Sequence, residues 1–89
     1  MSGTIEKLVA TIKSRKGSDI YSSYTALLLS KGSDYCLGKL KEEAAELEDA
    51  IKNKKNIVHE TADVIYHLIV SSFLVNFLNQ AYLDFLELP

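Results

Sequence analysis

The stretch from Val64 to Leu78 constrains the fold more than any other part of the chain, because it is apolar nearly all round. An amphipathic helix buries one stripe, whereas a helix that is apolar on every side has to be covered on every side. One chain of 89 residues supplies too few further helices to do this. We therefore predict a homodimer, in which the long helices of two copies complete a four-helix-type bundle.

The same stretch is too short to cross a bilayer and contains His67, so we expect no membrane partner. The charges scattered through the first sixteen residues exclude a signal peptide and favour a cytoplasmic protein. A net charge of −2 and a pI near 5.6 argue against a nucleic-acid partner, since phosphate binding needs an excess of basic residues. The lone cysteine, Cys36, has no partner for a disulfide and is expected to be a small buried side chain.

The whole chain, residues 1–89, is predicted to form one all-α domain. Four glycines and a single terminal proline leave few turn signals. Apolar periodicity predicts helices over residues 4–16, 24–30, about 35–52, about 57–79 and 80–88. The polar break at residues 53–56 is short enough to fold its two neighbours into an antiparallel hairpin.

The helix over residues 35–52 is expected to use Ser33 or Asp34 as its cap. Its apolar residues recur at intervals of three and four, which is typical of a packing seam. The seam consists of Leu37, Leu40, Ala44, Leu47 and Ile51.

Carboxylates gather on both helices of the predicted hairpin: Glu42, Glu43 and Glu46 on the first, Glu60 and Asp63 on the second. Glu46 and Glu60 are similar distances from the turn, so the two groups are expected to face each other. Carboxylates at such short range repel one another unless a cation neutralises them. Oxygen ligands select hard ions such as Mg²⁺, and no glutamate has the histidine three residues later that di-iron bundles use.

A plainer interpretation is that the acidic helix presents a solvated face, and the pairing of Glu48 with Lys52 supports it. Glu60 also suits the first turn of a helix. Asp63 lies deeper in an apolar helix, where a charge is costly unless it is paired or bound to metal. Asp63 therefore favours the metal site.

Several short motifs carry a family resemblance, in order and at matching spacing over about residues 5–80. They are Ser14-Arg15-Lys16, Ser23-Tyr24-Thr25-Ala26, Gly32, Lys39, Glu42-Glu43-Ala44-x-Glu46 and Glu60-x-Ala-Asp63-x-x-Tyr66-His67-Leu68. The acidic pairs resemble the ExxE…ExxD signature of the all-α, MazG-like nucleotide pyrophosphohydrolases. The remaining motifs resemble one branch of them, the phosphoribosyl-ATP pyrophosphohydrolases of histidine biosynthesis.

The resemblance implies Mg²⁺-dependent hydrolysis of phosphoribosyl-ATP to phosphoribosyl-AMP and pyrophosphate, in possible coupling to phosphoribosyl-AMP cyclohydrolase. It implies that Glu43, Glu46, Glu60 and Asp63 hold the metal. Glu42 would position the attacking water or serve as a further ligand. The other residues so implicated are Lys39 and Arg15 for phosphates, Ser23, Tyr24 and Thr25 for phosphate or ribose, and His67 as a hydrogen-bonded support.

Alternatives stay open for several of these residues. Arg15 can equally stabilise the end of its helix, and Tyr24 can equally be a packed aromatic. Tyr66 is assigned to packing, and His59 to no role. Lys41 stands where the family usually has glycine, which leaves substrate detail open. Two other functions compete: a house-cleaning nucleoside triphosphate pyrophosphatase and a non-catalytic helical dimerisation module.

Overall fold

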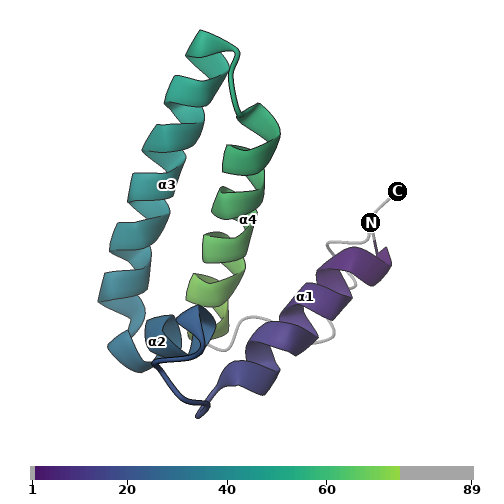
Figure 1. Ribbon diagram of the computed structural model, residues 1–89, viewed down its shortest axis with the longest axis vertical. Coiled ribbons are helices and arrows are strands. Elements are labelled where there is room, and N and C mark those ends of the chain that lie inside the picture. The colour runs from purple at the N-terminus through teal and green to yellow at the C-terminus, as the bar shows by residue number, and fades with distance from the viewer. Residues whose placement is uncertain (1, 75–89) are drawn as a thin grey trace.

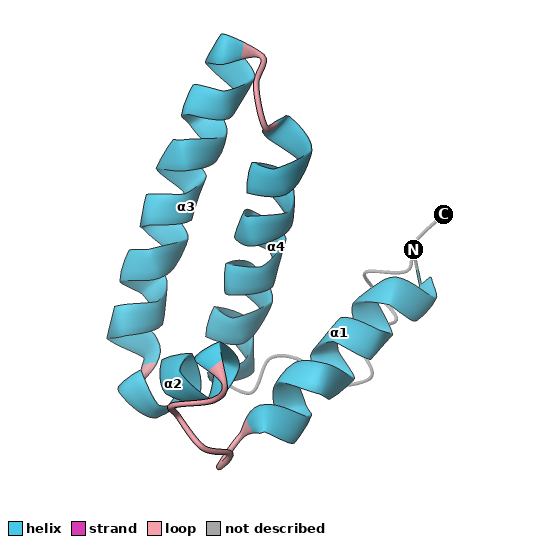
Figure 2. Ribbon diagram, in the orientation of Figure 1, coloured by secondary structure: helices cyan, strands magenta, loops and turns pink. Residues whose placement is uncertain are grey.

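The computed structural model describes residues 2–74, which form four helices and no strand (Figure 2). The helices are α1 (Ser2–Arg15), α2 (Tyr24–Lys31), α3 (Ser33–Asn53) and α4 (Ile57–Leu74). The all-α prediction is confirmed. The predicted end of the fourth helix at residue 79 and the short helix over 80–88 lie outside the described residues. Within them, no helix is long and apolar enough to cross a membrane.

Helices α3 and α4 lie side by side as an antiparallel hairpin and make the most extensive contact between described helices (Figure 1). The chain reverses through left-handed backbone at Lys54 and Asn56, where φ is 54° and 59°. The Lys55 N–H donates to the carbonyl of Ala50 at 3.0 Å, which closes the end of α3. The predicted break at residues 53–56 is therefore a tight helical turn.

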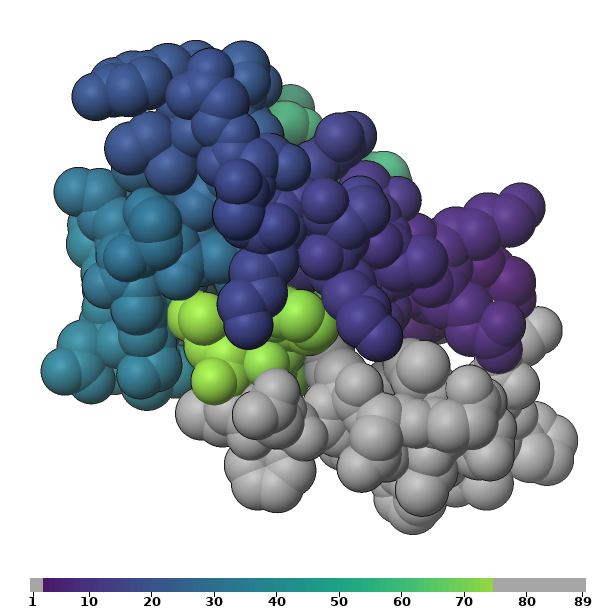
Figure 3. All heavy atoms as spheres, turned by 90° about the horizontal axis from the view of Figure 1, so that it is seen from below, coloured from purple at the N-terminus to yellow at the C-terminus, as the bar shows by residue number. Residues whose placement is uncertain are grey.

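The apolar core lies at the end of the hairpin remote from this turn, where α1 and α2 pack against it. Figure 3 views that end, with the start of α3 and α1 on either side of the end of α4. The buried core consists of Val9, Ile12, Leu28, Cys36, Ile69 and Val70. The Cys36 thiol donates to the carbonyl of Leu28 at 3.2 Å, so its assignment as a small buried side chain is confirmed.

The caps of α2 and α3 differ from each other. The Ser23 hydroxyl accepts a hydrogen bond from the Ala26 N–H at 3.1 Å and so caps α2. The prediction that Ser33 or Asp34 caps α3 is wrong, because Gly32 occupies the cap position with φ 91° and no side chain caps the helix. Ser33 is already helical, and Asp34 lies in the first turn.

The predicted seam of α3 is only partly buried in one chain. Leu37 and Ile51 remain 49% and 55% exposed, whereas Cys36 and Ala50 of the same helix are buried. On α4, Leu68 is also exposed. One chain therefore leaves apolar surface open on both long helices.

Candidate active site

Three of the predicted metal ligands meet across the hairpin. Glu43 and Glu46 come from α3 and Glu60 from the first turn of α4. Each offers a carboxylate oxygen, and the three oxygens lie within 4.8 Å of one another. We call these residues the carboxylate cluster. The expectation that Glu46 and Glu60 face each other is confirmed.

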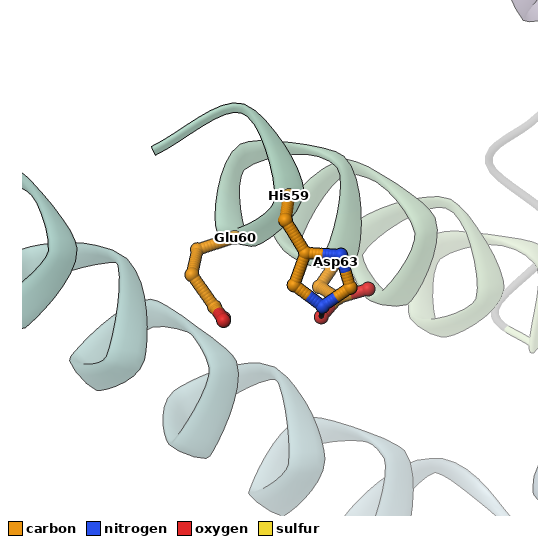
Figure 4. Close-up of side chains that lie close together, drawn as sticks. All are labelled: His59, Glu60 and Asp63. Atoms are coloured by element: carbon orange, nitrogen blue, oxygen red, sulfur yellow. Dashed lines mark ion pairs between the residues drawn. The ribbon is translucent and has the colours of Figure 1, made fainter. Parts of the chain in front are cut away.

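Asp63 belongs to a second, overlapping group with Glu60 and His59 (Figure 4). Its carboxylate forms an ion pair with His59 Nε2 at 3.4 Å. Figure 4 shows Glu60 reaching towards α3, while Asp63 lies beside His59. Asp63 therefore adjoins the carboxylate cluster through Glu60. Sequence reasoning gave His59 no role, although its spacing of four from Asp63 was the signal for this pair.

The carboxylate cluster is short of positive charge. The Oε2 atoms of Glu43 and Glu60 are buried and have no hydrogen-bond partner among the described residues. Burial raises the pKa of both carboxyls, and the neighbouring Glu46 raises them further. An all-oxygen set with buried oxygens left unpaired is suited to a hard divalent cation, so these residues fit Mg²⁺.

Lys39 and Glu42 pair with each other at the edge of the carboxylate cluster. The Lys39 ammonium donates to the Glu42 carboxylate at 3.3 Å, and this hydrogen bond raises the pKa of Lys39. The Glu42 side chain is solvent-exposed and lies outside the carboxylate cluster. Farther along α3, the predicted pair of Glu48 and Lys52 is confirmed at 3.5 Å.

Hydrogen bonds between side chains join α2 to α4 beside the cluster. The hydroxyl of Tyr24 lies 3.2 Å from His67 Nε2, and His67 Nδ1 lies 2.8 Å from the carbonyl oxygen of Asp63. Burial raises the pKa of Tyr24. His67 is only 5% exposed, and these two contacts satisfy both of its ring nitrogens within the protein.

A second bond in this contact was not foreseen. The Thr25 hydroxyl pairs with the hydroxyl of Tyr66, whose ring stacks 6.3 Å from that of Tyr24. Burial is the largest cause raising the pKa of Tyr66. The signal was available in the sequence, since a tyrosine hydroxyl on an otherwise apolar helix needs a polar partner. Ser23 contributes the cap of α2.

Arg15 is not brought to the carboxylate cluster. It is the last residue of α1, is exposed, and forms no ion pair within residues 2–74. In Figure 1 the end of α1 lies near α2, at the opposite end of the molecule from the hairpin turn. Nearer that turn, a cavity of about 220 Å³ opens beside the cluster. It is lined by Glu46, Asp49, Ala50, Asn53, Lys55, Asn56 and Glu60.

Comparison with known proteins places the whole hairpin within one family. A family model described as phosphoribosyl-ATP pyrophosphohydrolase matches residues 5–77. The chain belongs to the phosphoribosyl-ATP pyrophosphohydrolase family. The match includes α2, the carboxylate cluster and the bonds of Tyr24 and Thr25 to α4.

Relatives in this family are similar over most of the chain. The phosphoribosyl-ATP pyrophosphatase of Rhodobacter capsulatus is 48% identical over 68 residues, which is 74% of this chain and 66% of the relative. That of Jannaschia sp. is 47% identical, with 74% and 67% covered. The histidine biosynthesis bifunctional protein HisIE of Wolinella succinogenes is 46% identical over 76% of this chain and 31% of the relative.

The chain spans about 66% of the length of the Rhodobacter relative, just under two thirds. No solved structure matches it. The family assignment therefore rests on sequence similarity alone, and the arrangement of the candidate site comes from the structure of this chain.

Proposed function

We propose that this chain hydrolyses phosphoribosyl-ATP to phosphoribosyl-AMP and pyrophosphate by cleaving the bond between the α and β phosphates. The observation that carries the proposal is the carboxylate cluster, with two buried oxygens unpaired, in a member of this family. Such a cluster is unfavourable by itself and is suited to a cation that accompanies a triphosphate.

Glu43, Glu46 and Glu60 would hold Mg²⁺, with Asp63 as the fourth ligand after it turns from His59. Bound Mg²⁺ neutralises phosphate charge and helps to orient an in-line attack. The protein's share is to hold the three carboxylates together across two rigid helices. The unpaired oxygens of Glu43 and Glu60 are available before the metal arrives, so these two residues would need little rearrangement.

Lys39 and Glu42 would exchange partners when substrate binds. A phosphate that forms an ion pair with the Lys39 ammonium would free the Glu42 carboxylate. Glu42 could then position or deprotonate the attacking water. Their ion pair is exposed and therefore weak, so this exchange costs little. Arg15 is proposed as a further phosphate contact, and the Ser23 hydroxyl keeps its hydrogen free for phosphate or ribose.

The working unit is proposed to be a homodimer. Leu37 and Ile51 on α3 and Leu68 on α4 leave apolar surface open in one copy, and a second copy would cover it. Sedimentation at micromolar concentration is expected to give twice the 9.9 kDa mass of one chain. A mass near 9.9 kDa would contradict this.

We further propose that the reaction occurs in the cytoplasm and supplies a phosphoribosyl-AMP cyclohydrolase. The Wolinella relative is named as a bifunctional protein of histidine biosynthesis, which supports such a coupling. Adding a separate cyclohydrolase to the assay is expected to consume the product without changing the initial rate of pyrophosphate release.

The deciding experiment measures pyrophosphate release with Mg²⁺ from phosphoribosyl-ATP, from ATP and from deoxynucleoside triphosphates. Strong preference for phosphoribosyl-ATP, abolished by EDTA, is expected. Activity across the panel would instead assign a house-cleaning pyrophosphatase, and the Lys41→Gly variant would then test the pocket. Inactivity on every substrate, with metal present, would leave the helical dimerisation module.

A further inference from the structure

We propose that the Tyr24 hydroxyl accepts a hydrogen bond from a ribose hydroxyl of the substrate. His67 sets this direction because it accepts the hydrogen bond that the Tyr24 hydroxyl itself donates. The inference rests on the proposed function and adds to it the orientation of the nucleotide. It places a ribose at the α2 side of the carboxylate cluster.

The direction of each hydrogen bond follows from the Asp63 backbone. A carbonyl oxygen only accepts, so His67 Nδ1, at 2.8 Å from it, carries a hydrogen and donates. A neutral imidazole carries one N–H, so Nε2 is left as an acceptor. With the imidazole neutral, the Tyr24 hydroxyl, 3.2 Å from Nε2, is therefore the donor.

A tyrosine hydroxyl has a single hydrogen, and in this arrangement Tyr24 has already used it. What remains on its oxygen is the capacity to accept. Phosphate oxygens are acceptors and gain nothing from such a group, whereas a ribose hydroxyl can donate to it. Phosphate and ribose are the two substrate groups that the sequence suggested for Tyr24, and the direction of its hydrogen bond selects ribose.

Tyr24 also lies where a nucleotide bound at the carboxylate cluster could meet it. Its side chain begins α2 and is 47% exposed, although His67 behind it is buried. The charges of Lys39 and Glu43 both act on it, so it lies near the edge of the carboxylate cluster. Phosphates at the cluster would leave the adjoining ribose within reach of this side of α2.

Tyr66 provides a matched control for Tyr24, because it is also a tyrosine in the contact between α2 and α4. Its hydroxyl pairs with Thr25, which belongs to the same contact between α2 and α4. Tyr66→Phe removes one hydroxyl and one hydrogen bond, as Tyr24→Phe does. Tyr24 is an exposed residue and Tyr66 is half-buried, so we expect only the Tyr24 change to affect contact with a nucleotide.

The test compares kcat/KM for phosphoribosyl-ATP with that for analogues in which one ribose hydroxyl at a time is replaced by hydrogen. The wild-type protein should favour the intact substrate over one analogue by about tenfold, the value of one hydrogen bond. Tyr24→Phe should bring this ratio close to one, and Tyr66→Phe should leave it unchanged. A ratio that Tyr24→Phe leaves unchanged for every analogue would overturn the proposal.

His67 is a positioning residue in this scheme, and its variants should change specificity without changing metal binding. His67→Leu removes the acceptor and should lower the ratio, whereas His67→Gln keeps an acceptor near the position of Nε2 and should restore part of it. Both should bind Mg²⁺ as the wild-type protein does. Equal ratios in the Leu, Gln and wild-type proteins would contradict the role of His67.

A measurement without substrate separates this inference from the proposed function. The ¹⁵N NMR shifts of His67 should identify the tautomer protonated at Nδ1, with an Nε2 shift that moves in Tyr24→Phe but not in Tyr66→Phe. A ring that carries a hydrogen on Nε2, alone or on both nitrogens, would overturn the inference even if the enzyme is active. The correct tautomer in a protein that does not hydrolyse phosphoribosyl-ATP would overturn the proposed function alone.

Discussion

Two polar regions lie next to each other in this hairpin, and they are built in opposite ways. In the carboxylate cluster, Glu43 and Glu60 keep buried oxygens without partners, and the charge of Glu46 raises the pKa of both. In the contact between α2 and α4, Tyr66 pairs with Thr25 and Tyr24 pairs with His67, so the polar groups satisfy one another. The first region fits the cation that we propose for it, whereas the hydrogen bonds of the second lie within the protein.

This difference separates binding from support. A buried polar group without a partner costs free energy that a ligand can recover, so such groups mark the place where a ligand is expected. A satisfied network stabilises the fold and fixes the position of its neighbours. Changes in the carboxylate cluster should therefore reduce activity far more than stability, and loss of the pair formed by Thr25 and Tyr66 should do the reverse.

The largest expected effect is the loss of pyrophosphate release when a residue of the carboxylate cluster is substituted. Glu60→Gln keeps the size of the side chain and removes a charged ligand, so pyrophosphate release should fall by about 100-fold or more, at least the loss expected from an outer partner of a metal ligand. Glu48→Gln on the outer face of α3 is the matched control and should retain nearly full activity. Equal activity in the two variants would remove the cluster from the active site.

The next effect is on stability when a divalent cation is added. A site that only the folded protein offers should gain about 2.7 kcal/mol of unfolding free energy at a Mg²⁺ concentration a hundredfold above Kd. Thermal unfolding with and without Mg²⁺ measures this gain. Glu43→Gln should lose most of it and Tyr66→Phe none, so a gain that survives Glu43→Gln would place the metal elsewhere.

The contact between α2 and α4 should give a smaller effect on stability. Removing either hydroxyl of the pair, by Thr25→Val or Tyr66→Phe, should lower the unfolding free energy by about 1 kcal/mol. Denaturant unfolding of both single variants and the double variant forms a thermodynamic cycle. The double variant should lose less than the sum of the single losses, and strict additivity would mean that the two hydroxyls do not interact.

Within residues 2–74, the sequence predicted the helices and the opposed carboxylates well because both depend on short-range periodicity. Spacings of three and four place Glu43 and Glu46 on one face, and a short turn sets Glu60 opposite Glu46. Which apolar residues of α3 are buried within one chain was beyond such reasoning. An apolar stripe on α3 suggested the contact face, but Leu37 and Ile51 remain exposed in one chain.

Side-chain partners were harder to predict than faces. The pairing of Thr25 with Tyr66 joins residues 41 positions apart, and it depends on where α2 crosses α4. The same holds for Tyr24 and His67, 43 positions apart. The pairing of Lys39 with Glu42 is local, but helical spacing could not decide between that partner and the carboxylate cluster.

The smallest effect expected is a change of stability with pH in the protein without metal. The pKa of Glu43 is raised in the folded state, first by burial and then by Glu46, so the folded protein holds this proton more tightly than the unfolded chain. Its contribution to stability is complete below the ordinary pKa of a glutamate. It is lost as the pH rises through the raised value.

Glu43→Gln removes this titration and keeps a neutral side chain at every pH. In EDTA, the variant should match the wild-type protein at low pH and become slightly more stable than it as the pH approaches neutrality. Glu48→Gln, on the outer face of α3, should show no such divergence. Thermal unfolding across this pH range measures the difference in stability. If the wild-type protein instead became more stable relative to Glu43→Gln as the pH rises, the Glu43 charge would already be compensated without metal.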